Sequence, residues 1–260
     1  MSNVIAEKLE FAKKTAISAG DILLERFENT QSKLKSKREV VTDADLASEE
    51  FIIGAIETEF GESILSEESH EHSKLEDKMW IIDPLDGTNN YANGIPFFSV
   101  VIAYYEEGRS LFGVIYEPIR EELYWSDGEL SYLNNRHIRV SKTNRLIDSI
   151  AATGFPYNRE KDNENNLDHF TKIALNVRGI RRIGSAALDL AYVACGRMDV
   201  YWELNLKPWD LAAGELIVRC AGGKTGIFNG SEWTIEHGRI VASNPELFRK
   251  TCNILNDEES

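Results

Sequence analysis

The sequence predicts a mixed α/β protein of the α+β type, and three patterns along the chain carry this prediction. Apolar residues recur at three- and four-residue intervals near the N-terminus, which is typical of amphipathic helices. Short β-rich runs then follow one another up to Ser126, which indicates an antiparallel meander. From about Asn144 strands and helices alternate. We therefore expect an N-terminal α+β half over residues 1–143 and a C-terminal α/β half over residues 144–260, either fused or forming one large domain.

Two helices are expected at the start of the chain. The first covers Ile5 to Phe27, where charged residues separate the periodic apolar ones. The polar and basic segment Ser32 to Glu39 reads as a surface loop or hairpin. A second helix begins near Asp43 or Asp45, since either residue can cap its N–H groups. The side chains that this helix is expected to bury are Leu46, Ile52, Ile53, Ile56 and Phe60.

The strands of the first half follow an acidic loop from Glu62 to Lys78. Met79 to Ile82 is expected to be a short buried strand that stops at Asp83-Pro84, because proline disfavours helix at the residue before it. The strands of the meander are then expected over Phe97 to Tyr105, Leu111 to Tyr116 and Glu122 to Ser126.

The second half is expected to alternate strands with helices. The expected strands are Ile150 to Thr153, Val200 to Trp202 and Ile240 to Ala242. The expected helices are Asn163 to Asn176, Ser185 to Cys195 before Gly196, and Leu211 to Cys220 before Gly222-Gly223.

Composition restricts the class of protein. Forty-three acidic and 29 basic residues give a formal net charge of −14, which opposes nonspecific attraction to nucleic acid or to anionic lipid. We expect no nucleic-acid partner and no membrane partner. An anionic substrate would need bound cations or local backbone amides to reverse the field where it binds.

Cysteine usage favours a cytoplasmic location. Cys195, Cys220 and Cys252 are widely spaced and form no C-x-x-C pair, so neither a disulfide framework nor a structural zinc site is expected. Charges interrupt the segment from Met1 to Phe27 every few residues, and no stretch approaches the ~20 apolar residues of a membrane span. We expect neither a signal peptide nor an anchor.

The most informative stretch is Trp80 to Tyr91, where a buried strand delivers Asp83 and Asp86 into a tight turn. Proline fixes the turn, and the Leu85 carbonyl would lie on the same side, which gives the oxygen-rich ligation that magnesium prefers. Asp-Pro and Asp-Gly are common turn formers on their own. Their combination behind a buried strand favours a metal site.

A phosphate site is expected beside the carboxylates. Gly87 admits close approach of the backbone. The amides of Gly87 and Thr88 would bind a phosphate if a helix starts there, because unsatisfied N–H groups and the helix dipole favour an anion.

At this point the sequence resembles a known family. Trp80 to Tyr91 is similar to the first signature of the inositol monophosphatase family, and Lys207 to Gly214 is similar to the second. The similarity extends over nearly the whole chain and includes Val41 to Asp45, Leu65 to Glu68, Gly184 to Ala187 and Ala221 to Gly223. The resemblance implies a layered α-β-α-β-α sandwich, like that of sugar phosphatases, with the site between the two halves.

The resemblance also implies roles for individual residues. The metal ligands would be Glu67, Asp83, Asp86 and Asp210 with the Leu85 carbonyl, holding two or three magnesium ions. The catalytic residues would be Asp45, Glu67 and Thr88, of which Asp45 and Thr88 orient the attacking water. The substrate would contact Leu85, Asp86, Gly87, Thr88, Gly184, Ser185, Ala186, Glu203 and Asp210.

Each of these residue types also has a structural interpretation. Glu67 could belong to a solvated acidic loop, and the sequence alone does not decide whether Glu67 or Glu68 coordinates a metal. Asp45 and Asp210 could cap helices, with or without a second role. The segment beginning at Gly184 could serve only close helix packing, and Glu203 could be a surface residue.

Other charged residues are left outside the predicted site. Arg181 and Arg182 read as a solvated basic pair, although they could meet a second anionic group of the substrate. His70 and His72 lack partners in the pattern and are read as bystanders. Cys220 stands where many members of the family have an acidic residue before Ala-Gly-Gly, which leaves every proposed ligand in place.

The activity that the resemblance implies is magnesium-dependent, lithium-sensitive hydrolysis of a small phosphomonoester by activated water, in a homodimer. Inositol 1-phosphate is the first expected substrate; fructose 1,6-bisphosphate, histidinol phosphate and nucleotide phosphates stay open. Two alternatives from other classes are a regulator that binds a protein partner, such as an RNA-polymerase assembly, and a structural magnesium-binding module.

Overall fold

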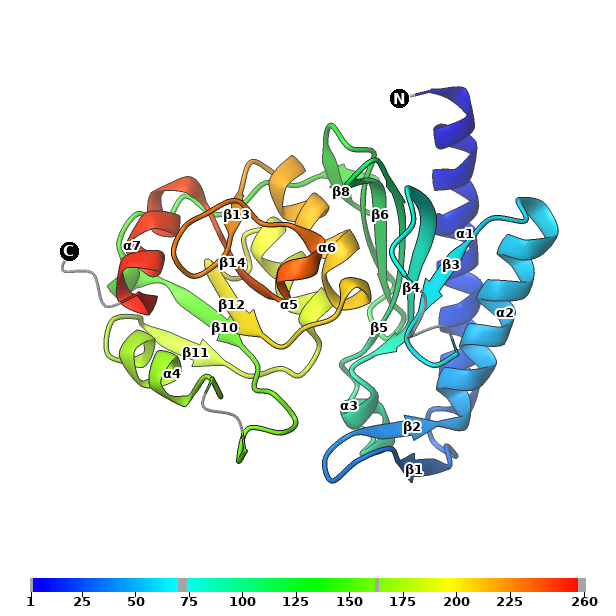
Figure 1. The fold of residues 1–260 in the computed structure, drawn as a ribbon, viewed down its shortest axis with the longest axis horizontal. Helices are drawn as coiled ribbons and strands as arrows, with labels where there is room; N and C mark the ends of the chain where they lie inside the picture. The colour runs from blue at the N-terminus through cyan, green and yellow to red at the C-terminus, as the bar shows by residue number, and fades with distance from the viewer. Residues whose placement is uncertain (1, 70–73, 162–163, 257–260) are drawn as a thin grey trace.

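The computed structural model describes residues 2–69, 74–161 and 164–256, and the chain forms two large sheets with helices on both sides of each (Figure 1). The prediction about His70 and His72 and the first residue of the helix expected from Asn163 lie outside the described residues. Five layers follow one another across the molecule as helices, sheet, helices, sheet and helices (Figure 1). The layered α-β-α-β-α sandwich is therefore confirmed.

The first layer consists of the two predicted N-terminal helices, α1 (Asn3–Arg26) and α2 (Asp43–Glu59). Between them β1 (Ser32–Leu34) and β2 (Val40–Thr42) form an antiparallel hairpin, so of the two structures expected for this segment, a surface loop or a hairpin, the hairpin is observed. Leu46 was expected to be buried on α2 but is 53% exposed. It follows Asp45, which faces the protein, so the helical rotation of about 100° per residue turns Leu46 towards solvent.

The second layer is a seven-stranded sheet in the order β3-β4-β5-β6-β7-β8-β9. Its strands are β3 (Ile64–Ser66), β4 (Lys78–Asp86), β5 (Ser99–Glu106), β6 (Arg109–Glu117), β7 (Glu122–Ser126), β8 (Ser131–Leu133) and β9 (Arg136–His137). Among the described strands of this sheet, only the β3–β4 pair is parallel. The predicted meander is confirmed, whereas β3, β8 and β9 were missed because two- and three-residue strands carry little periodicity.

Strand β4 does not stop at Asp83-Pro84 as expected. It continues to Asp86, and its register against β5 shifts between Asp83 and Asp86. A bulge at this point leaves residues out of the hydrogen-bond ladder, so Pro84, which has no N–H group, is tolerated inside the strand. Helix α3 (Thr88–Ala92) begins two residues after the strand ends.

The second half forms a mixed five-stranded sheet in the order β11-β10-β12-β14-β13. Its strands are β10 (Ile150–Thr153), β11 (Gly179–Arg181), β12 (Val200–Leu204), β13 (Lys224–Gly226) and β14 (Arg239–Ser243). Its helices are α4 (Leu167–Ala174), α5 (Ala186–Ala194), α6 (Pro208–Cys220) and α7 (Pro245–Leu255), with short 3₁₀ turns at Leu146–Asp148 and Ile235–His237. The predicted strands are confirmed; α4 is shorter than expected, α6 begins earlier, and α7, β11 and β13 were missed.

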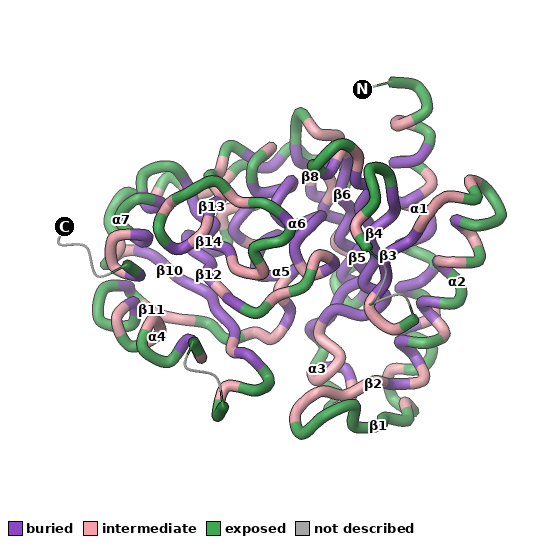
Figure 2. Tube along the Cα trace, in the orientation of Figure 1, coloured by how far each residue is buried: buried purple, intermediate pink, exposed green. Residues whose placement is uncertain are grey.

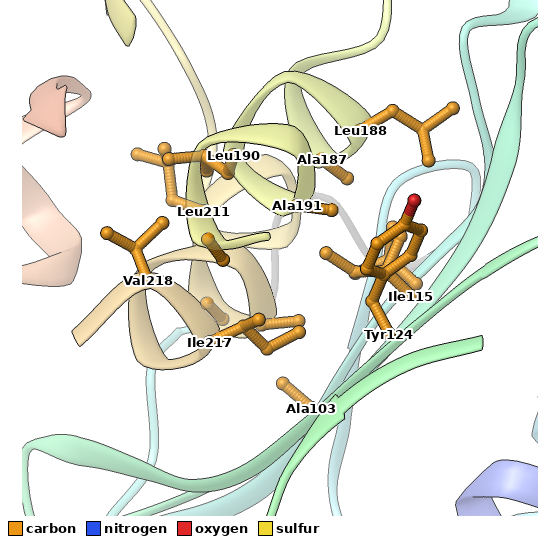
Figure 3. Packing of buried hydrophobic residues seen from close by; sticks show 14 of the residues in the cluster. Ala103, Ile115, Tyr124, Ala187, Leu188, Leu190, Ala191, Leu211, Ile217 and Val218 are labelled. Carbon is orange, nitrogen blue, oxygen red and sulfur yellow. The ribbon is translucent and has the colours of Figure 1, made fainter. Parts of the chain in front are cut away.

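Helices α5 and α6 lie between the two sheets and α4 and α7 cover the outer face of the second (Figure 1). Figure 2 shows that buried residues are concentrated in the sheets and the two central helices. In the central core, Ala187, Leu188 and Ala191 of α5 lie on the side of Ile115 and Tyr124 of the first sheet (Figure 3). The helices that fill this space belong to the second half, so the two halves share one core.

The predicted boundary between the two halves lies in the connection between the two large sheets. The first sheet ends at His137 and the second begins at Ile150, and a domain division at residue 143 stays a prediction. No helix among the described residues combines the length and apolar character needed to cross a membrane.

The contact between β6 and α6 allows a test of how tightly the central layer packs. A Cβ added at Gly113 would lie 2.7 Å from the Cα and 2.9 Å from the carbonyl oxygen of Ala213. We expect Gly113→Ala to lower the free energy of unfolding by about 1–3 kcal/mol, because backbone must move to admit the methyl group. Urea unfolding followed by circular dichroism measures this change.

Gly54 on α2 provides the matched control. A Cβ there meets nothing within 4 Å. Gly54→Ala should raise the free energy of unfolding by up to about 1 kcal/mol, since alanine favours the helix over glycine. Equal stability of the two variants would contradict the close approach of α6 to the sheet.

Candidate metal and phosphate site

A cavity of about 630 Å³ lies where the two halves meet, and it collects the predicted site residues. The predicted residues that line it are Glu67, Asp83, Leu85, Asp86, Gly87, Thr88, Gly184, Ser185, Ala186, Glu203 and Asp210. Asp45 is 1% exposed and lies behind Thr88, to which it is hydrogen-bonded. The structure thus brings together residues that are up to 165 positions apart in the sequence, from Asp45 to Asp210.

Three carboxylates converge at the centre of this cavity. Asp83 and Asp86 flank the bulge of β4, and Asp210 lies in the first turn of α6. Each offers one oxygen, and these oxygens lie within 4.8 Å of one another. Burial raises the pKa of Asp83 well above its usual range, and the neighbouring carboxylates of Glu67, Asp86 and Asp210 raise it further. Without a cation, this arrangement favours protonated carboxyl groups.

Asp86 is held from the opposite half of the protein by the N-terminus of α5. Its Oδ2 accepts a hydrogen bond from the Ser185 hydroxyl and another from the Ala187 amide at 3.0 Å. Burial raises the Asp86 pKa, and these hydrogen bonds act in the opposite direction. Part of the Gly184–Ala186 segment is therefore engaged by a site carboxylate.

Asp210 does not cap α6 as an N-cap residue. The helix begins at Pro208, so Asp210 is the third helical residue, and its Oδ2 accepts a hydrogen bond from the Lys207 amide at 2.7 Å. Proline at the first helical position explains the earlier start, because its fixed φ suits that position. Burial raises the pKa of Asp210 to about 8.

Glu67 and Glu68, at the end of β3, both form ion pairs with Lys35 but differ in their contact with the cavity. Glu67 lines the cavity, and its pKa is raised well above the usual range by burial and by the Asp210 carboxylate. Glu68 forms an ion pair with Lys35 at 2.5 Å, whereas Lys35 lies 3.5 Å from Glu67. The geometry therefore places Glu67, of the two, beside the carboxylate cluster.

Thr88 is fixed by two acceptors at the floor of the cavity. Its hydroxyl lies 3.0 Å from Asp45 Oδ1 and 2.9 Å from the Leu85 carbonyl oxygen. The other Asp45 oxygen accepts from the Thr42 amide at 2.8 Å, so Thr42 caps α2 and Asp45 completes a capping box as its third residue. Neither Asp43 nor Asp45 is the N-cap residue that the sequence suggested.

Gly87 is required at the start of α3. Its φ is +94°, and an added Cβ would lie 3.0 Å from the Phe97 carbonyl oxygen. The first N–H groups of a helix have no acceptor inside it, and those of α3 begin at the cavity wall formed by Gly87 and Thr88. This arrangement provides the backbone donors expected for a phosphate group.

Glu203 also lines the cavity, near the end of β12. It accepts a hydrogen bond from the Tyr201 hydroxyl at 2.7 Å, and burial raises its pKa to about 7. An added Cβ at Gly154 would lie only 2.0 Å from Glu203 Oε1. Gly154 is thus a site residue that sequence reasoning missed.

Other missed residues lie at the cavity wall. Arg182 lines the cavity, and its charge lowers the pKa of Glu203; nothing in the pattern of residues separates it from Arg181. Tyr157 lines the cavity too, and burial raises its pKa to about 12. Asp189 on α5 is buried nearby, and burial followed by the charge of Glu203 raises its pKa well above the usual range. Only their tertiary positions identify these residues.

The donor set fits magnesium. Carboxylate oxygens and a backbone carbonyl are hard ligands, which Mg²⁺ prefers, and the central group contains no sulfur or imidazole ligand among the described residues. Mutual repulsion among the carboxylates would be relieved by divalent cations. Asp83, Asp86 and Asp210 are therefore suited to hold such ions, with Glu67 and the Leu85 carbonyl beside them.

The chain is similar to known proteins over almost its whole length. A family model described as the inositol monophosphatase family matches residues 5–260. The Nus factor SuhB of Pasteurella multocida is 40% identical, with 94% of each chain covered. An inositol-1-monophosphatase of Mesorhizobium japonicum is 38% identical, with 91% of each chain covered.

Solved structures share the arrangement of layers. The extragenic suppressor protein suhB of Bartonella henselae has a TM-score of 0.88 at 36% identity, covering 97% of this chain and all of that one (100%). An inositol monophosphatase from Anabaena (Nostoc) has a TM-score of 0.89 at 38% identity, covering 98% of this chain and 97% of that one.

The raised pKa values predict how pH affects the metal-free protein. The Asp210 pKa rises from an ordinary 3.8 to about 8 on folding, and that of Asp83 rises in the same direction. Between the two values the folded protein holds a proton that the unfolded chain has released, so raising the pH favours unfolding. We expect the melting temperature in EDTA to fall between about pH 5 and pH 8.

Magnesium should oppose this fall, because the ion and the proton compete for the same oxygens. The increase in melting temperature caused by Mg²⁺ should therefore be larger at about pH 8 than at about pH 5. Asp210→Asn, which cannot ionise, is the control and should show a weaker pH dependence in EDTA. An equal effect of Mg²⁺ at both pH values would contradict the carboxylate site.

Proposed function

Because the chain belongs to the inositol monophosphatase family, we propose that it is a magnesium-dependent phosphatase that hydrolyses a small phosphomonoester. The family expected from the two sequence signatures is thereby confirmed. The observation that carries the proposed activity is the group of Asp83, Asp86 and Asp210 oxygens within 4.8 Å, beside the backbone donors of α3. Phosphoryl transfer depends mainly on positioning and charge neutralisation, which such a group would supply.

The ligands proposed for two or three magnesium ions are Glu67, Asp83, Asp86, Asp210 and the Leu85 carbonyl. When bound, the ions would neutralise phosphate charge and make a water molecule easier to deprotonate. The Gly87 and Thr88 amides would bind the phosphate oxygens at the same place.

Thr88 and Asp45 would orient the attacking water. The Thr88 hydroxyl proton has acceptors in Asp45 and Leu85, so its oxygen lone pairs are left to accept a hydrogen bond from water. Burial raises the pKa of Asp45 to about 6, which leaves it mainly ionised near pH 7 and able to take a proton through Thr88. Direct attack by water requires no phosphoenzyme.

Glu203 is proposed to bind the hydroxyl groups of the substrate. Its carboxyl group lines the same cavity as the carboxylate group, where it could bind the alcohol part of a phosphomonoester. This favours a polyol phosphate, and inositol 1-phosphate is the first candidate. The same chemistry on fructose 1,6-bisphosphate, histidinol phosphate or a nucleotide phosphate remains the alternative.

The names of the relatives favour a second candidate function. Several relatives are called Nus factor SuhB, including one 40% identical to this chain. A regulator that binds a protein partner is therefore a distinct proposal, with phosphatase activity secondary. The formal net charge of −14 supports a protein partner rather than direct contact with nucleic acid. For the phosphatase, we further propose that it is a cytoplasmic homodimer and that lithium inhibits it.

Phosphate release from a panel of substrates tests the activity. The panel contains inositol, sugar, histidinol and nucleotide phosphates, each with Mg²⁺, with EDTA, and with Mg²⁺ plus Li⁺. We expect release with Mg²⁺, none with EDTA, less with Li⁺, and the highest kcat/KM for inositol 1-phosphate. If the folded protein released phosphate from none of these substrates in Mg²⁺, the proposed phosphatase activity would be ruled out.

A substitution at the carboxylate group separates the two candidate functions. Asp83→Asn should lower kcat by at least about a hundredfold, because it removes a ligand charge that the transition state needs. The variant should stay folded, since neutralising a buried carboxylate removes repulsion. A pull-down that retains the same partner with Asp83→Asn would show that partner binding is independent of hydrolysis.

A further inference from the structure

The inner face of α2 contacts three segments that carry proposed site residues. Asp45 contacts Thr88, as described above. Three residues later, the Ser48 hydroxyl donates to the Pro84 carbonyl oxygen at 2.8 Å, inside the β4 bulge. One residue further, Glu49 reaches the turn that follows β3. Helical spacing of three and four residues puts these side chains on one face.

One oxygen atom of Glu49 accepts three hydrogen bonds from residues in or next to that turn. Its Oε1 accepts from the Ser66 hydroxyl, from the Glu68 amide at 3.2 Å and from the Ser69 amide at 3.1 Å. Glu49 is only 4% exposed and does not line the cavity. These three bonds surround Glu67 in the sequence, two on its C-terminal side and one on its N-terminal side.

The turn needs such an anchor because its charges repel one another. Asp210 and the adjacent Glu68 repel Glu67, whereas Lys35 lies 3.5 Å from Glu67 and at the shorter distance of 2.5 Å from Glu68. An unrestrained turn would move Glu67 away from the carboxylate group into solvent. Hydrogen bonds from backbone amides to a buried carboxylate resist that movement, since breaking them leaves a buried charge unsatisfied.

We propose that Glu49 is a positioning residue that holds Glu67 at the magnesium site through the backbone of residues 66–69. This inference rests on the proposed metal site and adds a residue that acts on it without touching it. Some groups orient a metal ligand without touching the metal. When such a group is removed, metal affinity commonly falls about 10–100-fold. Glu49 has that relation to Glu67.

Magnesium affinity measured by calorimetry tests the proposal. Glu49→Ala should weaken Mg²⁺ binding about tenfold or more. Glu49→Gln should stay near the wild type, because its amide oxygen can still accept the three hydrogen bonds. Glu50→Ala, an exposed neighbour on α2, is the matched control and should leave the affinity unchanged.

The Glu67→Ala background distinguishes positioning from general stability. If Glu49 acts through Glu67, Glu49→Ala should weaken Mg²⁺ binding no further in that background, because coupled residues are not additive. Additive losses, or unchanged affinity in the single variant, would overturn the proposal. A lower melting temperature in EDTA with wild-type affinity would also overturn it, since that result describes a purely structural residue.

Ser66→Ala covers the case in which Glu49→Ala does not fold. It removes one donor to Glu49, and the affinity for Mg²⁺ should fall roughly two- to tenfold, the range of one hydrogen bond. Unchanged affinity in this variant counts against the proposal. If the wild type binds Mg²⁺ but hydrolyses no phosphomonoester, the proposed phosphatase fails while calorimetry still decides the role of Glu49.

Discussion

The repulsion among buried carboxylates is the constraint on which the arrangement of this protein depends. Asp83 and Asp86, which are buried, and Asp210, which is partly buried, present oxygens within 4.8 Å of one another. Charged groups seldom lie so close without cations, because burial and like charge both favour neutral forms. The surrounding fold must therefore hold these carboxylates in place through local structural features. These features are the β4 bulge for Asp83 and Asp86, the first turn of α6 for Asp210, and the N-terminus of α5 for Asp86.

Asp86 connects this constraint to the layered architecture. It belongs to the first sheet, but its hydrogen-bond donors Ser185 and Ala187 belong to a helix of the second half. The partial positive charge at the N-terminus of α5 stabilises the carboxylate. Since α5 and α6 also fill the space between the sheets, the packing that joins the halves is the packing that builds the site.

The sequence predicted the parts of the site that depend on local order. A buried strand followed by two aspartates, a glycine and a threonine predicted that Asp83 and Asp86 lie together in a tight turn, because these residues are neighbours in the chain. That this turn is a bulge inside β4 was not predicted. Cap positions were less accurate: Pro208 moved the start of α6 ahead of Asp210, and Thr42 took the N-cap of α2.

Residues whose importance lies in tertiary contacts were missed. Glu49 looks like an ordinary helical glutamate, and Gly154 like a loop glycine, until the turn after β3 and the end of β12 are placed against them. Leu46 was misassigned for a related reason, since apolar character alone does not tell which face of a helix is covered. The order of strands and helices along the chain was enough to predict the layers. The contacts of Glu49, Gly154 and Leu46 depend on how those layers pack.

The net charge of −14 is compatible with an anionic substrate because the field is decided locally. Arg38, Arg159, Arg182 and Lys207 line the cavity together with the acidic group. Exposed charges further away than about 10 Å are screened at moderate salt. Arg38 is paired with Glu160, so with cations on the acidic group the approaching phosphate would meet chiefly the other basic side chains and the amides of α3. The acidic remainder of the surface would act mainly on solubility and on the choice of partners.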